Sequence, residues 1–84
     1  MNTSKEIYEY KYLNWVCVLV VNDDDSMTLT EYVGDKQPRK FNDVKIVGIG
    51  RNGGERVQYS NDGVSLPFKN YNDGELDKRW KKIK

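Results

Sequence analysis

The sequence predicts a mainly β fold in which about five antiparallel strands form a curled sheet or small barrel and one amphipathic helix ends the chain. Short apolar segments with two-residue alternation recur along the chain, and clusters of Gly, Asn, Asp and Ser separate them. Helical periodicity is present only in the last dozen residues. With 84 residues the chain can bury one modest core, so a single domain over residues 1–84 is expected.

The first strand is predicted over residues 7–21, with a bend or bulge near Leu13-Asn14. Residues 13–21 are almost continuously apolar and rich in β-branched side chains, as in a strand covered on both faces. A run this long exceeds the usual length of one flat strand. Alternation over residues 7–12 places three tyrosines on one side of the strand: Tyr8, Tyr10 and Tyr12.

Four further strands are predicted from apolar alternation between turn signals. They cover residues 27–33, 44–49, 55–59 and 64–68. Asn52-Gly53 is the strongest hairpin signal in the chain. Pro67 lacks a backbone N–H and therefore predicts an edge position for the last of these strands.

A C-terminal helix is predicted over residues 73–83. Asn72 and Glu75 have the spacing of a capping box, and acidic residues precede basic ones as the helix dipole favours. Leu76, Trp80 and Ile83 fall at i, i+4 and i+7, which would place them on one face of this helix.

Composition predicts a cytoplasmic protein without membrane association. No basic segment followed by an apolar run occurs near Met1, and the longest apolar stretch is about seven residues, far below the roughly 20 needed for a membrane span. Cys17 is the only cysteine, so no disulfide can form within the chain. It lies in an apolar run without a neighbouring cation and is interpreted as a core residue.

Catalysis is not expected, and no catalytic, cofactor-binding or metal site is predicted. The chain has no histidine, the usual general base near neutral pH. Gly48, Gly50 and Gly53 match a phosphate-binding glycine pattern, but a strand follows them where that chemistry requires a helix. The acidic run at residues 23–25 lacks the glycine that a calcium loop needs at its sixth position. We therefore expect the protein to act by binding.

Aromatic and charged groups supply the candidate binding residues. Tyr8, Tyr10 and Tyr12 are compatible with core packing, with a protein interface or with stacking on nucleic-acid bases. The acidic turn offers Asp23, Asp24 and Asp25 to a basic partner. Two basic segments complete the set, namely Lys36, Arg39, Lys40, Arg51 and Arg56 in the first and Lys78, Arg79, Lys81 and Lys82 in the second. If the second segment does not bind a partner, its charges are simply the solvated face of the predicted helix.

The favoured hypothesis is a small protein-binding regulator or inhibitor. It depends on the missing catalytic side chains, the surplus of tyrosine and the uneven charge in a chain whose net charge is only +1. Small β-rich proteins of this composition are often encoded by bacteriophages and other mobile elements, which suggests a host enzyme as the target. A nucleic-acid-binding small barrel using the tyrosines and the basic tail is the alternative. A subunit of a larger assembly, including a homodimer, is the third hypothesis.

Overall fold

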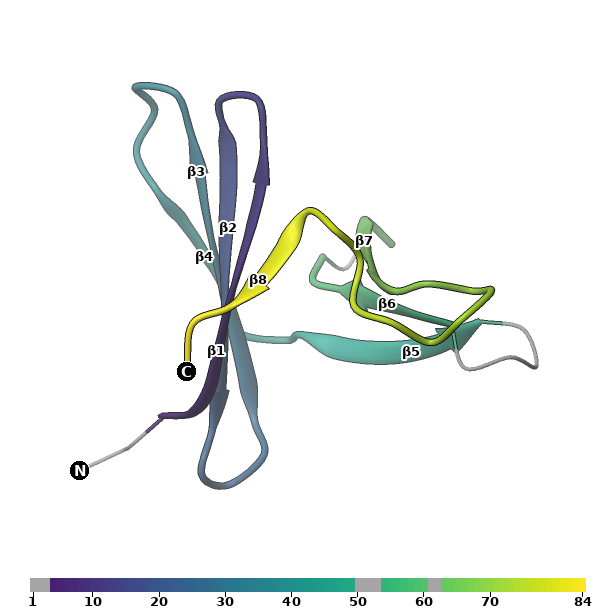
Figure 1. The fold of residues 1–84 in the computed structure, drawn as a ribbon. Helices are drawn as coiled ribbons and strands as arrows, with labels where there is room; N and C mark the ends of the chain where they lie inside the picture. The colour runs from purple at the N-terminus through teal and green to yellow at the C-terminus, as the bar shows by residue number, and fades with distance from the viewer. Residues whose placement is uncertain (1–3, 50–53, 61–62) are drawn as a thin grey trace.

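The computed structural model describes residues 4–49, 54–60 and 63–84, which form eight strands in two antiparallel sheets (Figure 1). The first sheet has the strand order β4-β3-β2-β1-β8, and the second has the order β5-β6-β7. The strands are β1 Ser4–Tyr12, β2 Trp15–Asn22, β3 Met27–Val33, β4 Arg39–Phe41, β5 Lys45–Ile49, β6 Gly54–Gln58, β7 Ser65–Lys69 and β8 Trp80–Lys82.

The mainly β class predicted from the sequence is confirmed. The predicted arrangement, about five strands in one curled sheet or small barrel, is replaced by eight strands in two sheets, of five and three strands. The strands predicted over residues 27–33, 44–49, 55–59 and 64–68 match β3, β5, β6 and β7 to within one residue at each end. β7 is an edge strand, as Pro67 indicated. Asn52-Gly53, the predicted hairpin turn between β5 and β6, lies outside the described residues.

The single bent strand expected over residues 7–21 is instead two strands that pair with each other. Tyr12 lies opposite Trp15, so Leu13-Asn14 is a two-residue hairpin loop. Leu13 has a φ of 56°, a left-handed conformation that leucine rarely adopts. Only a bend or bulge was predicted at this position, because Leu13-Asn14 lacks the glycine typical of two-residue hairpin loops.

The helix expected over residues 73–83 is absent, and a turn followed by β8 takes its place. Gly74 has a φ of 70°, which is incompatible with a helical first turn. Asp73 and Asp77, which would lie in that helix, each accept a hydrogen bond from the backbone N–H two residues further on, at 2.9 Å. A helix cap and favourable charges at the helix ends contribute only tenths of a kcal/mol to about 1 kcal/mol each, less than the burial of the Trp80 side chain in β8.

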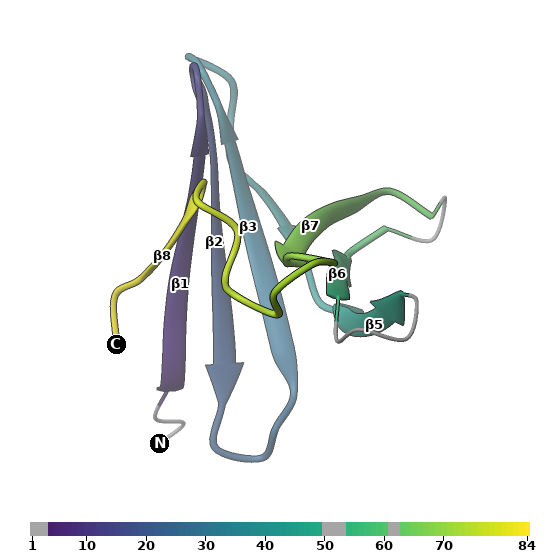
Figure 2. The ribbon, with the colours of Figure 1, turned by 45° about the vertical axis from the view of Figure 1, so that its right-hand side comes forward.

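One hydrophobic core joins the two sheets. The inner face of the five-stranded sheet supplies Tyr10, Cys17, Leu19, Leu29 and Trp80, and the other sheet and its connections supply a second set, namely Val44, Val57, Tyr59, Leu66 and Phe68. β5, β6, β7 and the connection to β8 all lie on one side of the five-stranded sheet (Figures 1 and 2). The opposite side of that sheet carries no other described element.

Candidate functional site

The face of the five-stranded sheet that points away from the core is the candidate functional site. Residues of β1, β2 and β3 alternate between the core and this side. We call it the outer face and define it by seven residues: Ile7, Val16, Val18, Val20, Thr28, Thr30 and Tyr32. All seven are partly or largely exposed, whereas their inward-facing neighbours Cys17, Leu19 and Leu29 are fully buried.

Three valines form the centre of the outer face. Val18 lies opposite Thr30 on β3, and Val16 lies opposite Tyr32. On the other side, Val20 lies opposite Ile7 on β1. Side chains directly opposite one another in an antiparallel sheet are in contact range. On the β1 side Val18 and Val16 lie opposite Glu9 and Lys11, so the valines form an apolar strip along β2 between the polar and aromatic residues of β3 and the charged residues of β1.

A basic rim surrounds this strip. Lys11 lies opposite Val16, Lys40 lies opposite Thr30, and Lys81 lies opposite Glu9. Among the ion pairs formed by the described residues, none involves these three lysines. Their charges are therefore available to acidic groups of a partner.

The β1–β2 hairpin loop exposes two further large side chains at the end of the sheet. Leu13 is 86% exposed and Tyr12 is 51% exposed, although both are large apolar side chains. Leu13 also has the unfavourable φ described above. Strained residues persist where the surrounding structure holds them and are often found at sites of function.

The three tyrosines of the sequence hypothesis lie on the inner side of β1 in different environments. Tyr10 is 2% exposed, and its ring lies 5.2 Å from that of Trp80. Tyr8 is half-buried against Phe68, and its hydroxyl donates a hydrogen bond to Glu6 at 2.8 Å. Burial raises the pKa of Tyr8 to about 12. With Tyr10 in the core, only Tyr12 presents a largely exposed ring.

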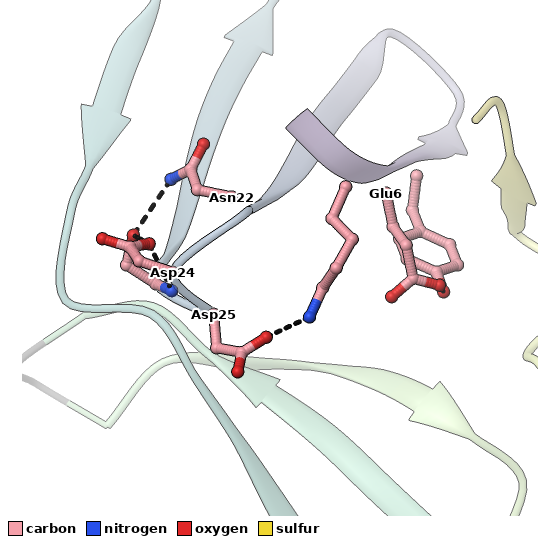
Figure 3. A network of polar contacts seen from close by, with 7 residues as sticks. Glu6, Asn22, Asp24 and Asp25 are labelled. Atoms are coloured by element: carbon pink, nitrogen blue, oxygen red, sulfur yellow. Dashed lines mark hydrogen bonds and ion pairs between the residues drawn. The ribbon is translucent and has the colours of Figure 1, made fainter. Parts of the chain in front are cut away.

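The predicted acidic residues form the turn between β2 and β3 (Figure 3). Asp24 accepts hydrogen bonds from the backbone N–H and the hydroxyl of Ser26, and the hydroxyl bond is the main cause of its lowered pKa. Asp25 forms an ion pair with Lys5. Asp23 is exposed in the same turn. These bonds stabilise the reversal between two central strands, which is the local role expected of Asp in a turn.

The first group of basic residues is dispersed over the molecule. Lys36 is exposed in the loop after β3, and Lys40 is on the rim of the outer face. The Arg39 guanidinium lies 5.3 Å from the centre of the Phe41 ring and 3.8 Å from Glu31. Arg56 donates hydrogen bonds to the hydroxyl and the backbone carbonyl of Ser65. Arg51 lies outside the described residues.

The second basic group lies on and before β8. Arg79 binds Asp77 through two parallel hydrogen bonds of 3.0 and 3.1 Å, and this contact lowers the pKa of the Asp77 carboxyl. Lys82 lies 3.2 Å from Glu6 on the inner side of the sheet. Lys81 points the other way, towards the outer face, and Lys78 is exposed. The four bases therefore do not form one surface.

A small open cavity of about 250 Å³ was not foreseen from the sequence. Six residues line it, namely Glu31, Arg39, Phe41, Tyr59, Ser60 and Val64. Glu31 is its most notable group, since its largely buried carboxylate accepts a hydrogen bond from the Trp15 indole at 2.9 Å. The cavity is smaller than the roughly 300–1,000 Å³ of typical ligand sites. Glu31 is already held by Trp15 and Arg39, so the cavity is a weaker candidate than the outer face.

Groups with metal-binding or nucleophilic chemistry do not converge in the part of the chain that the structure describes. No cluster of three or more His, Cys, Asp or Glu side chains suited to a metal ion is found there. Cys17 is fully buried, and burial raises the pKa of its thiol to about 12. A thiol with this pKa is a poor nucleophile at neutral pH.

The sequence did contain a signal for the outer face. Val16, Val18 and Val20 alternate with Cys17 and Leu19, but every residue in this run is apolar, so the segment predicted a strand covered on both faces. The other residues that the structure describes cover only one of those faces, and that became clear only from the arrangement of the two sheets (Figure 2).

Fold and site together define a small two-sheet β protein in which residues 4–49, 54–60 and 63–84 leave one sheet face uncovered. Comparison with protein-family models, curated proteins and solved structures found no match to this chain. The described part of the chain contains no helical segment with the length and hydrophobicity of a membrane span.

Proposed function

We propose that this protein is a small non-catalytic regulator or inhibitor that binds a partner protein through the outer face. The observation that carries the proposal is the central valine column, formed by Val16, Val18 and Val20, which the protein's own core leaves uncovered. The three valines are partly exposed and contiguous along β2. Contiguous apolar surface that is accessible to solvent marks interaction sites in soluble proteins.

The composition of the outer face supports a protein partner. Fully buried centres of protein interfaces are apolar and poor in charge, while their rims are polar. The valine column has this character, and Lys11, Lys40 and Lys81 supply the rim. Each square ångström of apolar surface removed from water contributes about 25 cal/mol, so contact with the column would supply much of the binding energy.

The charge of the rim defines the partner's surface. Three lysines and one acid, Glu9, surround the column, so the rim is positive overall. The matching surface is flat and apolar, with Asp or Glu at its border. A regulator of this kind acts by covering a functional surface of its target. If a bacteriophage or another mobile element encodes the protein, the target is an enzyme of the bacterial host.

Nucleic-acid binding has less support. Sequence-independent binding of single strands depends on aromatic rings that stack on successive bases. Tyr32 is the single aromatic residue of the outer face, and Tyr10 is buried. The basic residues are also dispersed over several surfaces. A protein partner therefore accounts for the uncovered apolar face better than nucleic acid does.

The test is affinity capture from a lysate of the cells in which the protein occurs, with and without nuclease. Wild-type protein is compared with Val18→Lys, at the centre of the outer face, and with Val64→Lys. Val64 is 45% exposed, lies before β7 and serves as the matched control. Circular dichroism and thermal unfolding verify that each variant is folded.

We expect wild type and Val64→Lys to retain the same defined protein regardless of nuclease, and Val18→Lys to lose it. Retention that disappears with nuclease would favour the nucleic-acid alternative. Equal retention by Val18→Lys would place the binding surface elsewhere.

A further inference from the structure

Each sheet edge in this molecule exposes backbone N–H and C=O groups that another strand can pair with, and three of the four edges are protected. β4 and β8 have three residues each, of which two are cationic. Short strands and lysine or arginine side chains are the usual protection of an edge.

The β7 edge is protected by proline and by the chain itself. Pro67 lies within the strand and cannot donate a hydrogen bond. The following segment turns back along this edge, where the backbone N–H of Asp77 donates to the carbonyl of Phe68 at 2.8 Å and Lys69 pairs with Leu76. A further strand has no room to pair there.

β5 is the exception. It has five residues, Lys-Ile-Val-Gly-Ile, with no proline and a single charge, at Lys45. It pairs with β6 on one side, and none of the described residues pairs with its other side. Figures 1 and 2 show it as the outer border of the three-stranded sheet. Val47, at its centre, is 39% exposed.

We propose that two copies of this protein associate through β5, in antiparallel pairing about a twofold axis at Val47. The pairing would join the two three-stranded sheets into one continuous sheet with the order β7-β6-β5-β5-β6-β7. The inference is independent of the partner proposed above, because β5 and the outer face belong to different sheets.

A second copy fits this edge because the strand is complementary to itself. In the twofold register Val47 lies opposite Val47, and Lys45 lies opposite Ile49, so no like charges face each other. Ile46 lies opposite Gly48, where a Cβ atom would have no neighbour within 4 Å, so the isoleucine side chain has space. An isologous contact of this type closes as a dimer and cannot extend into fibres.

The association also has a consequence for binding. A dimer formed through β5 leaves the outer faces of both copies free, since they are on the five-stranded sheets. The dimer would therefore be bivalent, and a partner with two sites would be bound with higher apparent affinity than by one copy.

Charge substitutions at Val47 test the proposal. Two lysines or two glutamates facing each other across the axis repel, whereas one of each attract. Wild type, Val47→Lys, Val47→Glu and an equimolar mixture of the two variants are measured by sedimentation equilibrium over a series of concentrations. Val64→Lys is the matched control for an added surface charge, and Val18→Lys distinguishes association through the outer face.

We expect wild type, Val64→Lys and Val18→Lys to dimerise alike. Val47→Lys and Val47→Glu should each weaken the dimer by about ten-fold or more, and their mixture should restore it. A wild-type protein that stays monomeric at about 1 mM would overturn the proposal. So would variants at Val47 that dimerise like wild type, a mixture without recovery, or loss of the dimer in Val18→Lys.

Discussion

The indole N–H of Trp80 donates a hydrogen bond to the backbone carbonyl of Pro67. This contact joins β8, the last strand of the five-stranded sheet, to β7 at the edge of the three-stranded sheet. The Trp80 ring also lies 5.2 Å from Tyr10 and 5.5 Å from Phe68, one in each sheet. Trp80 is therefore the residue through which the C-terminal segment holds the two sheets together.

Truncating Trp80 should destabilise the protein strongly. Trp80→Ala removes a buried aromatic side chain and should lower the free energy of unfolding by about 3–5 kcal/mol. Trp80→Phe keeps a ring but loses the hydrogen bond to Pro67, and the cost should be smaller, about 1–2 kcal/mol. Urea unfolding followed by circular dichroism measures both. Equal stability of wild type and Trp80→Ala would mean that the C-terminal segment does not contribute to the core.

Replacing Leu13 by glycine should stabilise the protein. Leu13 is exposed and has a φ of 56°, a conformation that costs an L-residue about 1–2 kcal/mol. Glycine removes this cost but loses more entropy on folding, so a net gain of about 0.5–1 kcal/mol is expected. Leu13→Ala is the control, since it shortens the side chain and keeps the strain. If Leu13→Ala gained as much unfolding free energy as Leu13→Gly, the exposed leucine side chain and not the backbone conformation would be responsible.

Stability should decrease in alkaline solution. Burial raises the pKa of Cys17 from 9.0 and the pKa values of Tyr8 and Tyr59 from 10.0, each to about 12. The unfolded chain therefore loses these protons at a lower pH than the folded chain, and deprotonation favours unfolding. The stabilising effect is complete below pH 9 and is lost as the pH rises from about 9 to 12.

Urea midpoints measured between pH 7 and pH 11 check this prediction. In Cys17→Ala the decrease should begin about one pH unit later, since only the tyrosines remain. A midpoint that is constant up to pH 11 in wild type would contradict the burial of these groups.

Reversing one charge on the rim of the outer face should slow binding of the partner. Lys40→Glu places an acidic side chain opposite the Asp or Glu residues proposed at the border of the partner's surface. The association rate should therefore fall about three- to ten-fold at low salt. The difference should shrink as added salt screens the charges. Lys69→Glu, at an exposed lysine of β7 on the other sheet, is the control. Stopped-flow mixing with the purified partner measures the rates, and equal slowing by both variants would indicate a general charge effect.

The sequence predicted the strands better than the chain reversals. Alternating segments such as β3 and β6 were found because their apolar residues face one core. The Leu13-Asn14 hairpin was missed because it has no glycine and stores backbone strain instead. The helix prediction failed because its capping and charge signals are individually weak. Burial of Trp80 depends on contacts with Tyr10 and Phe68, which no local pattern reveals.

The candidate site could be predicted only in part. The sequence drew attention to the tyrosines of β1, but period-two alternation cannot say which face of a strand the rest of the chain will cover. Tyr10 faces the core, and Val16, Val18 and Val20 of β2 face away from it. Lys40 and Lys81 were among the predicted binding residues, and they lie on the rim of the outer face.

The affinity of the purified partner for the outer-face variant tests the central claim most directly. Isothermal titration calorimetry would compare wild type, Val18→Lys and Val64→Lys at one salt concentration. If the valine column is the centre of the interface, Val18→Lys should bind at least about a hundred-fold more weakly, and Val64→Lys should match wild type within about two-fold. Dissociation constants for Val18→Lys and wild type that agree within about two-fold would contradict the claim.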